Sequence, residues 1–137
     1  MKTNFLKTAI ITLGILSFTA VSGFGENSPV KQLIIEDAVI CQDVVDRTPI
    51  GSGEVFAKEV SKLFCFTKVT GALSNTNITH NWYHKGILKA SIILPVKSNS
   101  WRTYSSKRIV PEFKGEWMVE IISPNGVALE SIIFFIR

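Results

Sequence analysis

Residues 78–96 read ITHNWYHKGILKASIILPV, and this stretch decides the fold because it predicts a β-hairpin. Apolar and β-branched residues predominate in Ile78–Tyr83 and Ile87–Val96, as is typical of strands. The turn between them, HKG, ends in Gly86, which suits the left-handed backbone conformation of a tight turn. Pro95 is expected to end the second strand, because proline has no N–H to donate to a ladder.

The end of the chain predicts a second hairpin. Its strands are Glu116–Ser123 and Val127–Ile136, and they are joined by Pro124-Asn125-Gly126. Proline first and glycine last suit a three-residue loop built from a type I turn and a bulge. The apolar run Ile132–Ile136 is interpreted as a core strand or as an edge that pairs with a partner.

The residues upstream predict further strands at Gln32–Cys41 and Leu63–Val69. Loops are expected at residues 46–49, 51–53 and 71–77, and the spacing of Phe56, Val60 and Leu63 allows one short helical turn. About seven short strands without a long helix predict an all-β fold. We expect an antiparallel β-sandwich of immunoglobulin-like architecture, with a partly open barrel as the alternative.

The N-terminal residues predict an export signal at residues 1–25. Lys2 and Lys7 precede an uncharged, largely apolar run that is short for a membrane span, and Ser22 or Gly25 would precede the cleavage site. Residues 26–34 are interpreted as a connector and the start of the first strand, and residues 35–137 as the sandwich domain. The expected location is the periplasm or outside the cell; retention in the inner membrane by an uncleaved signal is the alternative, and no stable span is expected after cleavage.

The composition excludes some function classes. The chain has 137 residues, of which 46% are hydrophobic and 19% charged, which is typical of one globular domain. The formal net charge is +4, and removing Lys2 and Lys7 leaves +2 for the rest. This charge is too small for a nucleic-acid-binding surface, so no nucleic-acid partner is expected.

Residues 101–108 read WRTYSSKR and contain two aromatic side chains, three cations and three aliphatic hydroxyl groups without a carboxylate. Neither face of this octet would be purely apolar in a strand, so we expect an edge strand or a ridge at the rim of a sheet. Such a rim offers guanidinium groups and aromatic faces to a ligand with carboxylates or sugar rings. The alternative is that the aromatics fill the core margin and the cations pair with Glu112 or Glu116.

Cys41 and Cys65 are the only cysteines, and both lie in predicted strands. In an exported chain they favour a structural disulfide, which would close a loop of about 25 residues and stabilise the fold by roughly 3 kcal/mol. Two buried free thiols are the alternative, because cysteine also behaves as a small hydrophobe.

His80 and His84 lie four residues apart, about 13 Å along a strand, which is too far for one metal ion. No metal site and no cofactor are predicted. The sequence has no nucleophile elbow, phosphate-binding loop or dinucleotide motif, so we expect that the protein is not an enzyme. A hydrolase built on Ser106 and His80, with Ser105 as a second candidate serine, is the least favoured function. The alternative for His80 and Trp82 is a structural role, in which both pack along one sheet face.

Motifs spread over residues 36–136 resemble the bacterial domain-of-unknown-function family 2914. The resemblance rests on the following short motifs: Ile40-Cys41, Asp46-Arg47-x-Pro49, Leu63-x-Cys65-Phe66-Thr67, Ile78-Thr79-His80-x-Trp82, Pro95-Val96, the octet up to Lys107 and Gly115-Glu116-Trp117. It implies a small domain of bacterial envelope proteins and no established activity, so it provides no catalytic residues.

Together these features predict a non-catalytic binding module of the bacterial envelope. The candidate ligand-binding residues are His80, Trp82, Trp101, Arg102, Tyr104 and Lys107. The expected ligand is acidic or saccharide-like, such as an envelope polysaccharide, or else a protein partner. The alternative is a structural protein that pairs edge strands with itself or with a partner.

Overall fold

The computed structural model describes residue 23 and residues 32–137, and its described part contains ten strands and no helix. The strands are β1 (Ile34–Cys41), β2 (Asp43–Val45), β3 (Thr48–Ile50), β4 (Val55–Phe56), β5 (Lys62–Thr70), β6 (Thr76–His84), β7 (Ile87–Val96), β8 (Ser100–Arg108), β9 (Gly115–Ile122) and β10 (Ala128–Ile136). The all-β prediction is confirmed. The predicted export signal, apart from Gly23, and residues 26–31 of the predicted connector lie outside the described residues. Within these residues, no helix is long and apolar enough to cross a membrane.

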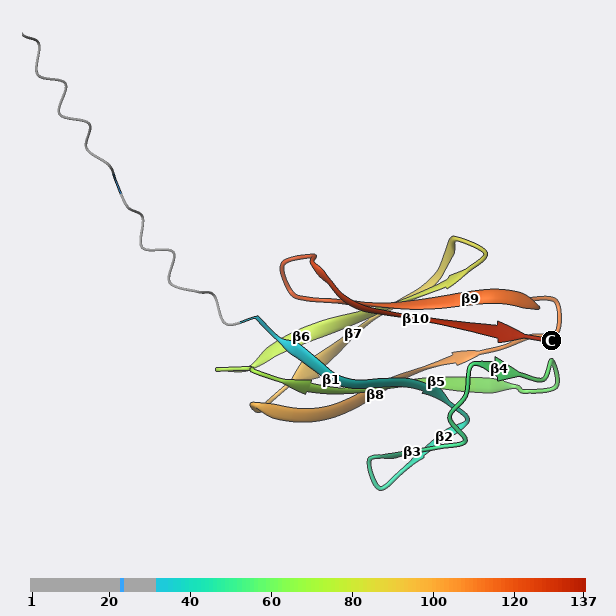
Figure 1. Cartoon of the computed structure of the whole chain (residues 1–137), viewed down its shortest axis with the longest axis horizontal. Coiled ribbons are helices and arrows are strands. Elements are labelled where there is room, and N and C mark those ends of the chain that lie inside the picture. The colour runs from blue at the N-terminus through green and yellow to red at the C-terminus, as the bar shows by residue number, and fades with distance from the viewer. Residues whose placement is uncertain (1–22, 24–31) are drawn as a thin grey trace, which may run out of the picture.

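The strands form a sandwich of two main sheets (Figure 1). One sheet has the order β4-β10-β9-β6-β7 and the other has the order β1-β5-β8. Every pairing in them is antiparallel except that of β4 with β10, which is parallel. The short β2–β3 hairpin forms a separate ladder that projects from the β1-β5-β8 layer in Figure 1.

The core lies between the two sheets because inward-facing residues alternate with outward-facing ones along each strand. Trp82, Trp117 and Phe134 are its largest fully buried aromatic side chains. The Phe134 ring stacks on Trp117 at a centroid distance of 6.0 Å and meets Trp82 edge to face at 6.2 Å. Leu63 and Cys65 reach the same cluster from the opposite sheet. The two predicted hairpins therefore provide most of one wall of the core.

Three short strands were missed by the sequence analysis, which explains why ten strands replace the predicted seven. Residues 46–47 of the predicted loop at 46–49 form the turn of the β2–β3 hairpin, with φ angles of 49° and 58°, whereas residues 48–49 belong to β3. The short helical turn near Phe56 is also wrong, because residues 55–56 form β4 and pair with β10. Both errors concern residues whose conformation depends on a partner segment.

Pro95 does not end its strand, since β7 continues to Val96. β7 is the last strand of its sheet, where a missing N–H on the open side removes no ladder hydrogen bond. The C-terminal hairpin agrees with its prediction more closely. The Gly126 N–H donates to the Ser123 carbonyl at 3.0 Å, and Gly126 has a φ of 83°.

The β6–β7 turn allows a test of whether the left-handed backbone conformation at residue 86 requires glycine. We expect Gly86→Ala to lower the free energy of unfolding by about 1–2 kcal/mol, because Gly86 has a φ of 79° and an added Cβ is strained there. No atom lies within 4 Å of that Cβ, so crowding does not contribute. Gly53→Ala is the matched control, since Gly53 has no positive φ and its Cβ would meet Phe56 at 3.6 Å, an ordinary contact. Urea denaturation of both variants checks this; equal effects would contradict it.

Candidate functional site

The octet 101–108 lies in β8, an outer strand of the β1-β5-β8 sheet. β8 pairs with β5 over nine residues without a bulge. Strand alternation divides the octet between two environments: Trp101, Thr103, Ser105 and Lys107 share one face, and the other residues share the opposite face. Ser105 is buried, whereas Arg102 and Tyr104 are exposed. The octet therefore does not form one surface, because one half faces the core and the other half faces solvent.

The inward half belongs to a hydrogen-bonded cluster between the sheets. The Ser105 Oγ lies 2.7 Å from His80 Nδ1 and accepts a hydrogen bond from Trp82 Nε1 at 3.0 Å. The other ring nitrogen, His80 Nε2, lies 3.0 Å from Thr67 Oγ1. Cys65 Sγ completes the chain at 4.0 Å from that hydroxyl. This cluster joins strands β5, β6 and β8 through their side chains.

The indole N–H of Trp82 is the starting point for assigning donors and acceptors in this cluster. The indole N–H can only donate, so the Ser105 hydroxyl accepts from Trp82 and has its own proton free for His80 Nδ1. We assign the Ser105 proton to the hydrogen bond with His80 Nδ1, so that His80 carries its own proton on Nε2 and donates it to Thr67 Oγ1. With this assignment, His80 is neutral and both of its nitrogens are paired. Burial lowers the pKa of His80 to about 4, which agrees with the neutral form.

The structure places His80 and Trp82, two of the predicted ligand-binding residues, in the core. Both have an exposed fraction of 0%, because they lie on the inward face of β6 and fill the core. Trp101 is half-buried against a second core cluster with Val69 and Ile78. Lys107 is half-buried, and its Nζ donates to the Arg108 carbonyl at 3.2 Å. Four of the six predicted residues thus do not face solvent freely.

The remaining two, Arg102 and Tyr104, lie on the outward face of the sheet. The register with β5 places Arg102 opposite Lys68 and Arg108 opposite Lys62. The Tyr104 ring meets Phe64 edge to face at 5.8 Å, and the Lys62 Nζ lies 5.0 Å from the Phe64 ring centre. We name Lys62, Phe64, Arg102, Tyr104 and Arg108 the basic face.

The cations of the basic face have no carboxylate partner among residues 32–137. Among the described residues, the one ion pair within 4.0 Å joins Lys68 to Glu36 at 2.7 Å. The Arg102 Nη1 donates only to the Arg47 carbonyl at the tip of the β2–β3 hairpin, at 3.4 Å. Glu112 and Glu116 do not pair with the octet, contrary to the alternative considered from the sequence. The face therefore presents guanidinium and ammonium groups that remain available to an outside anion.

Lys62 and Phe64 were missed because they belong to another strand. The sequence does contain a pattern that points to them. Every second residue from 62 to 68 is a cation or an aromatic, namely Lys62, Phe64, Phe66 and Lys68, and these residues share one face of β5. Only the pairing of β5 with β8 shows that this face continues the outward half of the octet. Phe66 itself is 3% exposed, so it does not belong to the accessible surface.

Residues 75–136 match a family described as "Protein of unknown function (DUF2914)". This confirms the family resemblance over that range. The DUF2914 match includes His80, Ser105 and the octet, whereas Lys62 and Phe64 precede it. The quoted motifs before residue 75 also lie outside the match. No curated protein matches the chain.

The predicted disulfide is absent, and Cys41 and Cys65 are buried free thiols. Ile40 pairs with Cys65 and Cys41 pairs with Phe64, so the two cysteines are one position out of register and point to opposite faces of the sheet. Cys65 enters the core, whereas the Cys41 thiol lies against the backbone of Ile50 and Asp43. Burial raises the pKa of Cys41 and raises the pKa of Cys65 to about 12.

His84 also has a structural environment. Its Nε2 donates to the Lys114 carbonyl at 2.7 Å, and its ring lies 4.9 Å from the Trp117 ring centre. Among residues 32–137, no three or more His, Cys, Asp and Glu side chains are grouped to hold a metal ion.

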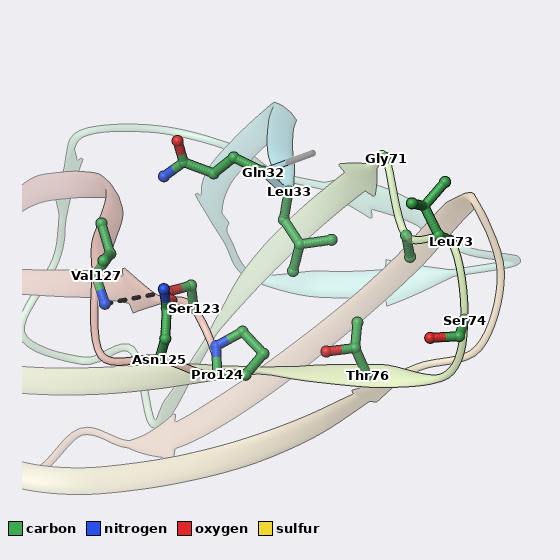
Figure 2. Close-up of a pocket in the computed structure, with 11 residues that line it drawn as sticks. Gln32, Leu33, Gly71, Leu73, Ser74, Thr76, Ser123, Pro124, Asn125 and Val127 are labelled. Atoms are coloured by element: carbon green, nitrogen blue, oxygen red, sulfur yellow. Dashed lines mark hydrogen bonds between the residues drawn. The ribbon is translucent and has the colours of Figure 1, made fainter. Parts of the chain in front are cut away.

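A cleft of about 670 Å³ lies at the end of the sandwich where β5 ends and β6 begins. Figure 2 shows it between the start of β1, the β5–β6 loop and the β9–β10 turn, where the Val127 N–H donates to Ser123 Oγ at 3.0 Å. Its lining residues are Gln32, Leu33, Gly71, Ala72, Leu73, Ser74, Thr76, Ser123, Pro124, Asn125 and Val127. No predicted site residue and no charged side chain belongs to this lining, so the cleft offers apolar contact and neutral hydrogen bonds.

Proposed function

We propose that this protein is an exported, non-catalytic binding module of the bacterial envelope that recognises an acidic ligand through its basic face. The observation that carries the proposal is the grouping of Lys62, Arg102 and Arg108 around the rings of Phe64 and Tyr104, with no ion pair to any of the three within the described part of the chain. Residues from two strands thus form one cationic and aromatic surface. Tyr104 is 48% exposed, so its ring is accessible.

The chemistry of the basic face suits anions attached to flat or ring-shaped groups. A guanidinium binds a carboxylate through two parallel hydrogen bonds, and such charge-assisted bonds are about twice as strong as neutral ones. Aromatic rings add apolar contact with sugar rings or with side chains. An acidic envelope polysaccharide and an acidic protein surface both combine these features.

The location of the serine–histidine contact supports a non-catalytic role. Ser105 and His80 lie within hydrogen-bonding distance, but they are 4% and 0% exposed and are held by Trp82 and Thr67. A nucleophile must contact its substrate, and this pair is sealed in the core. Ser106, the serine favoured for a hydrolase, lies on the outward face of β8, away from His80.

Removing both arginines tests the proposal. We expect Arg102→Ala with Arg108→Ala to weaken binding of polygalacturonate, an acidic polysaccharide, by about tenfold or more, because two charge-assisted contacts are lost. The free energy of unfolding should change by less than about 1 kcal/mol, since both side chains are on the surface. Isothermal titration calorimetry measures the affinity.

The matched control removes two cations elsewhere. Lys97→Ala with Lys114→Ala has the same net charge as the arginine variant but leaves the basic face intact. We expect it to keep polygalacturonate binding within about twofold at physiological salt, where distant charges are screened. An equal loss in both double variants, or no loss in the arginine variant, would show that the basic face is not the binding site.

A further inference from the structure

The outward face of the β4-β10-β9-β6-β7 sheet carries an apolar row that the fold covers only in part. Ile133, Met118, Tyr83 and Leu88 occupy matching positions on four adjacent strands. Their neighbours in sequence, including Trp82, Trp117 and Phe134, point into the core, so this row points outward. Leu88 is 52% exposed and Ile133 is 51% exposed. Contiguous apolar surface of this kind marks interaction sites in soluble proteins.

Acidic residues flank this row. Glu116 and Glu120 precede and follow Met118 on the same face of β9, and no ion pair involves either carboxylate within residues 32–137. Phe135, which is 37% exposed, pairs with Glu116. Asn81 pairs with Glu120, and its Oδ1 has no hydrogen-bond partner among the described residues. We name Tyr83, Leu88, Glu116, Met118, Glu120 and Ile133 the acidic face.

The acidic face and the basic face lie on opposite sides of the sandwich, as the two layers in Figure 1 show. They therefore cannot meet within one molecule. Each carries apolar or aromatic side chains in its middle. Beside them the basic face has three cations without an ion pair among residues 32–137, and the acidic face has two such carboxylates, so the charges of the two faces are complementary. We propose that the acidic face of one molecule docks on the basic face of a second copy of this chain. This inference rests on the basic face as a binding surface and names a partner for it.

The spacing of the charges is compatible with this contact. Glu116 and Glu120 are about 13 Å apart along an extended strand, and Arg102 and Arg108 are about 20 Å apart. The acidic pair thus fits within the span of the two long arginine side chains. Tyr104 and Phe64 lie between the cations of the basic face. In the proposed contact they pack against the apolar row of the second copy, as two sheets pack face to face.

The size of the faces predicts the strength of the contact. Four strands about 4.8 Å apart and nine residues long at about 3.3 Å per residue cover a footprint of roughly 600 Å². Stable complexes bury about 800 Å² on each partner, so we expect weak, concentration-dependent association. Because the two contacting surfaces differ, the contact is head-to-tail and continues from molecule to molecule.

Complementation between two variants tests the inference. Glu116→Gln with Glu120→Gln disables the acidic face, and Arg102→Gln with Arg108→Gln disables the basic face. In sedimentation velocity, the wild type should associate with increasing concentration and dissociate in about 0.5 M salt, where charges are screened. Each variant alone should associate at least about tenfold more weakly. An equimolar mixture should form a discrete 1:1 complex, because each variant keeps the face that the other has lost.

Several results would overturn the inference. These are a wild type that stays monomeric at all concentrations, a mixture that fails to form the 1:1 complex, and normal association of the arginine variant alone, which would indicate pairing of two acidic faces. Polygalacturonate separates this inference from the proposed function. If Arg102→Ala with Arg108→Ala abolishes polysaccharide binding while the wild type stays monomeric, only self-association is wrong. If that variant binds normally, the proposed function fails.

Discussion

Ser105→Ala should lower the free energy of unfolding by roughly 2–4 kcal/mol, because one hydroxyl satisfies two buried groups. Without it, Trp82 Nε1 loses the acceptor of its only hydrogen bond and His80 Nδ1 loses its partner. Each unsatisfied buried polar group costs about 1–3 kcal/mol. Since small domains are stable by only about 5–15 kcal/mol, this single change removes a large share of the total.

Ser106→Ala is the matched control for that experiment. It removes the same hydroxyl from the next residue, which lies on the outward face of β8 and makes no side-chain hydrogen bond in the described structure. We expect a change within about 0.5 kcal/mol. Urea denaturation followed by tryptophan fluorescence measures both variants at pH 7. Similar effects at the two positions would show that the buried cluster does not stabilise the fold.

The second large effect is a loss of folding stability at acidic pH. Burial lowers the pKa of His80 from its ordinary value of 6.5 to about 4, so the unfolded chain binds a proton at a higher pH than the folded chain does. Stability is therefore complete above pH 6.5 and falls as the pH decreases toward about 4. The expected loss is roughly 3 kcal/mol, since each pKa unit corresponds to about 1.4 kcal/mol. The cause is desolvation, because the protonated ring would lie in the core without a counter-ion.

Two glutamine variants isolate this effect from the carboxylates that titrate in the same range. His80→Gln should lower stability at pH 7 but lose the His80 share of the pH dependence, since glutamine does not titrate. His84→Gln, the control, should keep the His80 share of the pH dependence. The free energy of unfolding, measured from pH 7.5 to pH 4 for all three proteins, gives the comparison. If wild type and His80→Gln lose stability in parallel as the pH falls, His80 is not the titrating group.

Much of the fold follows from local patterns. The turns at Gly86 and Gly126 need left-handed backbone, and the flanking residues have strand composition, so both hairpins were predictable. The short strand β4 was not predictable, because it exists only through its pairing with the C-terminal strand. Two residues are too few for a sequence pattern.

The candidate site was only half predictable. Alternation along β8 correctly separates Trp101 and Ser105 from Arg102 and Tyr104. The partners of each half come from distant strands: Lys62 and Phe64 complete the basic face, and Thr67 and His80 complete the buried cluster. The family match over residues 75–136 includes only some of these partners.

The sequence by itself determined that this protein is a β structure, where its two long hairpins turn, and which residues of each strand share a face. These properties depend on neighbours a few positions apart. Only the tertiary structure decided which face is buried and which strands lie side by side. A shift of one residue in register reverses every side chain, and this is why Cys41 and Cys65 are separated while Ser105, His80 and Trp82 meet.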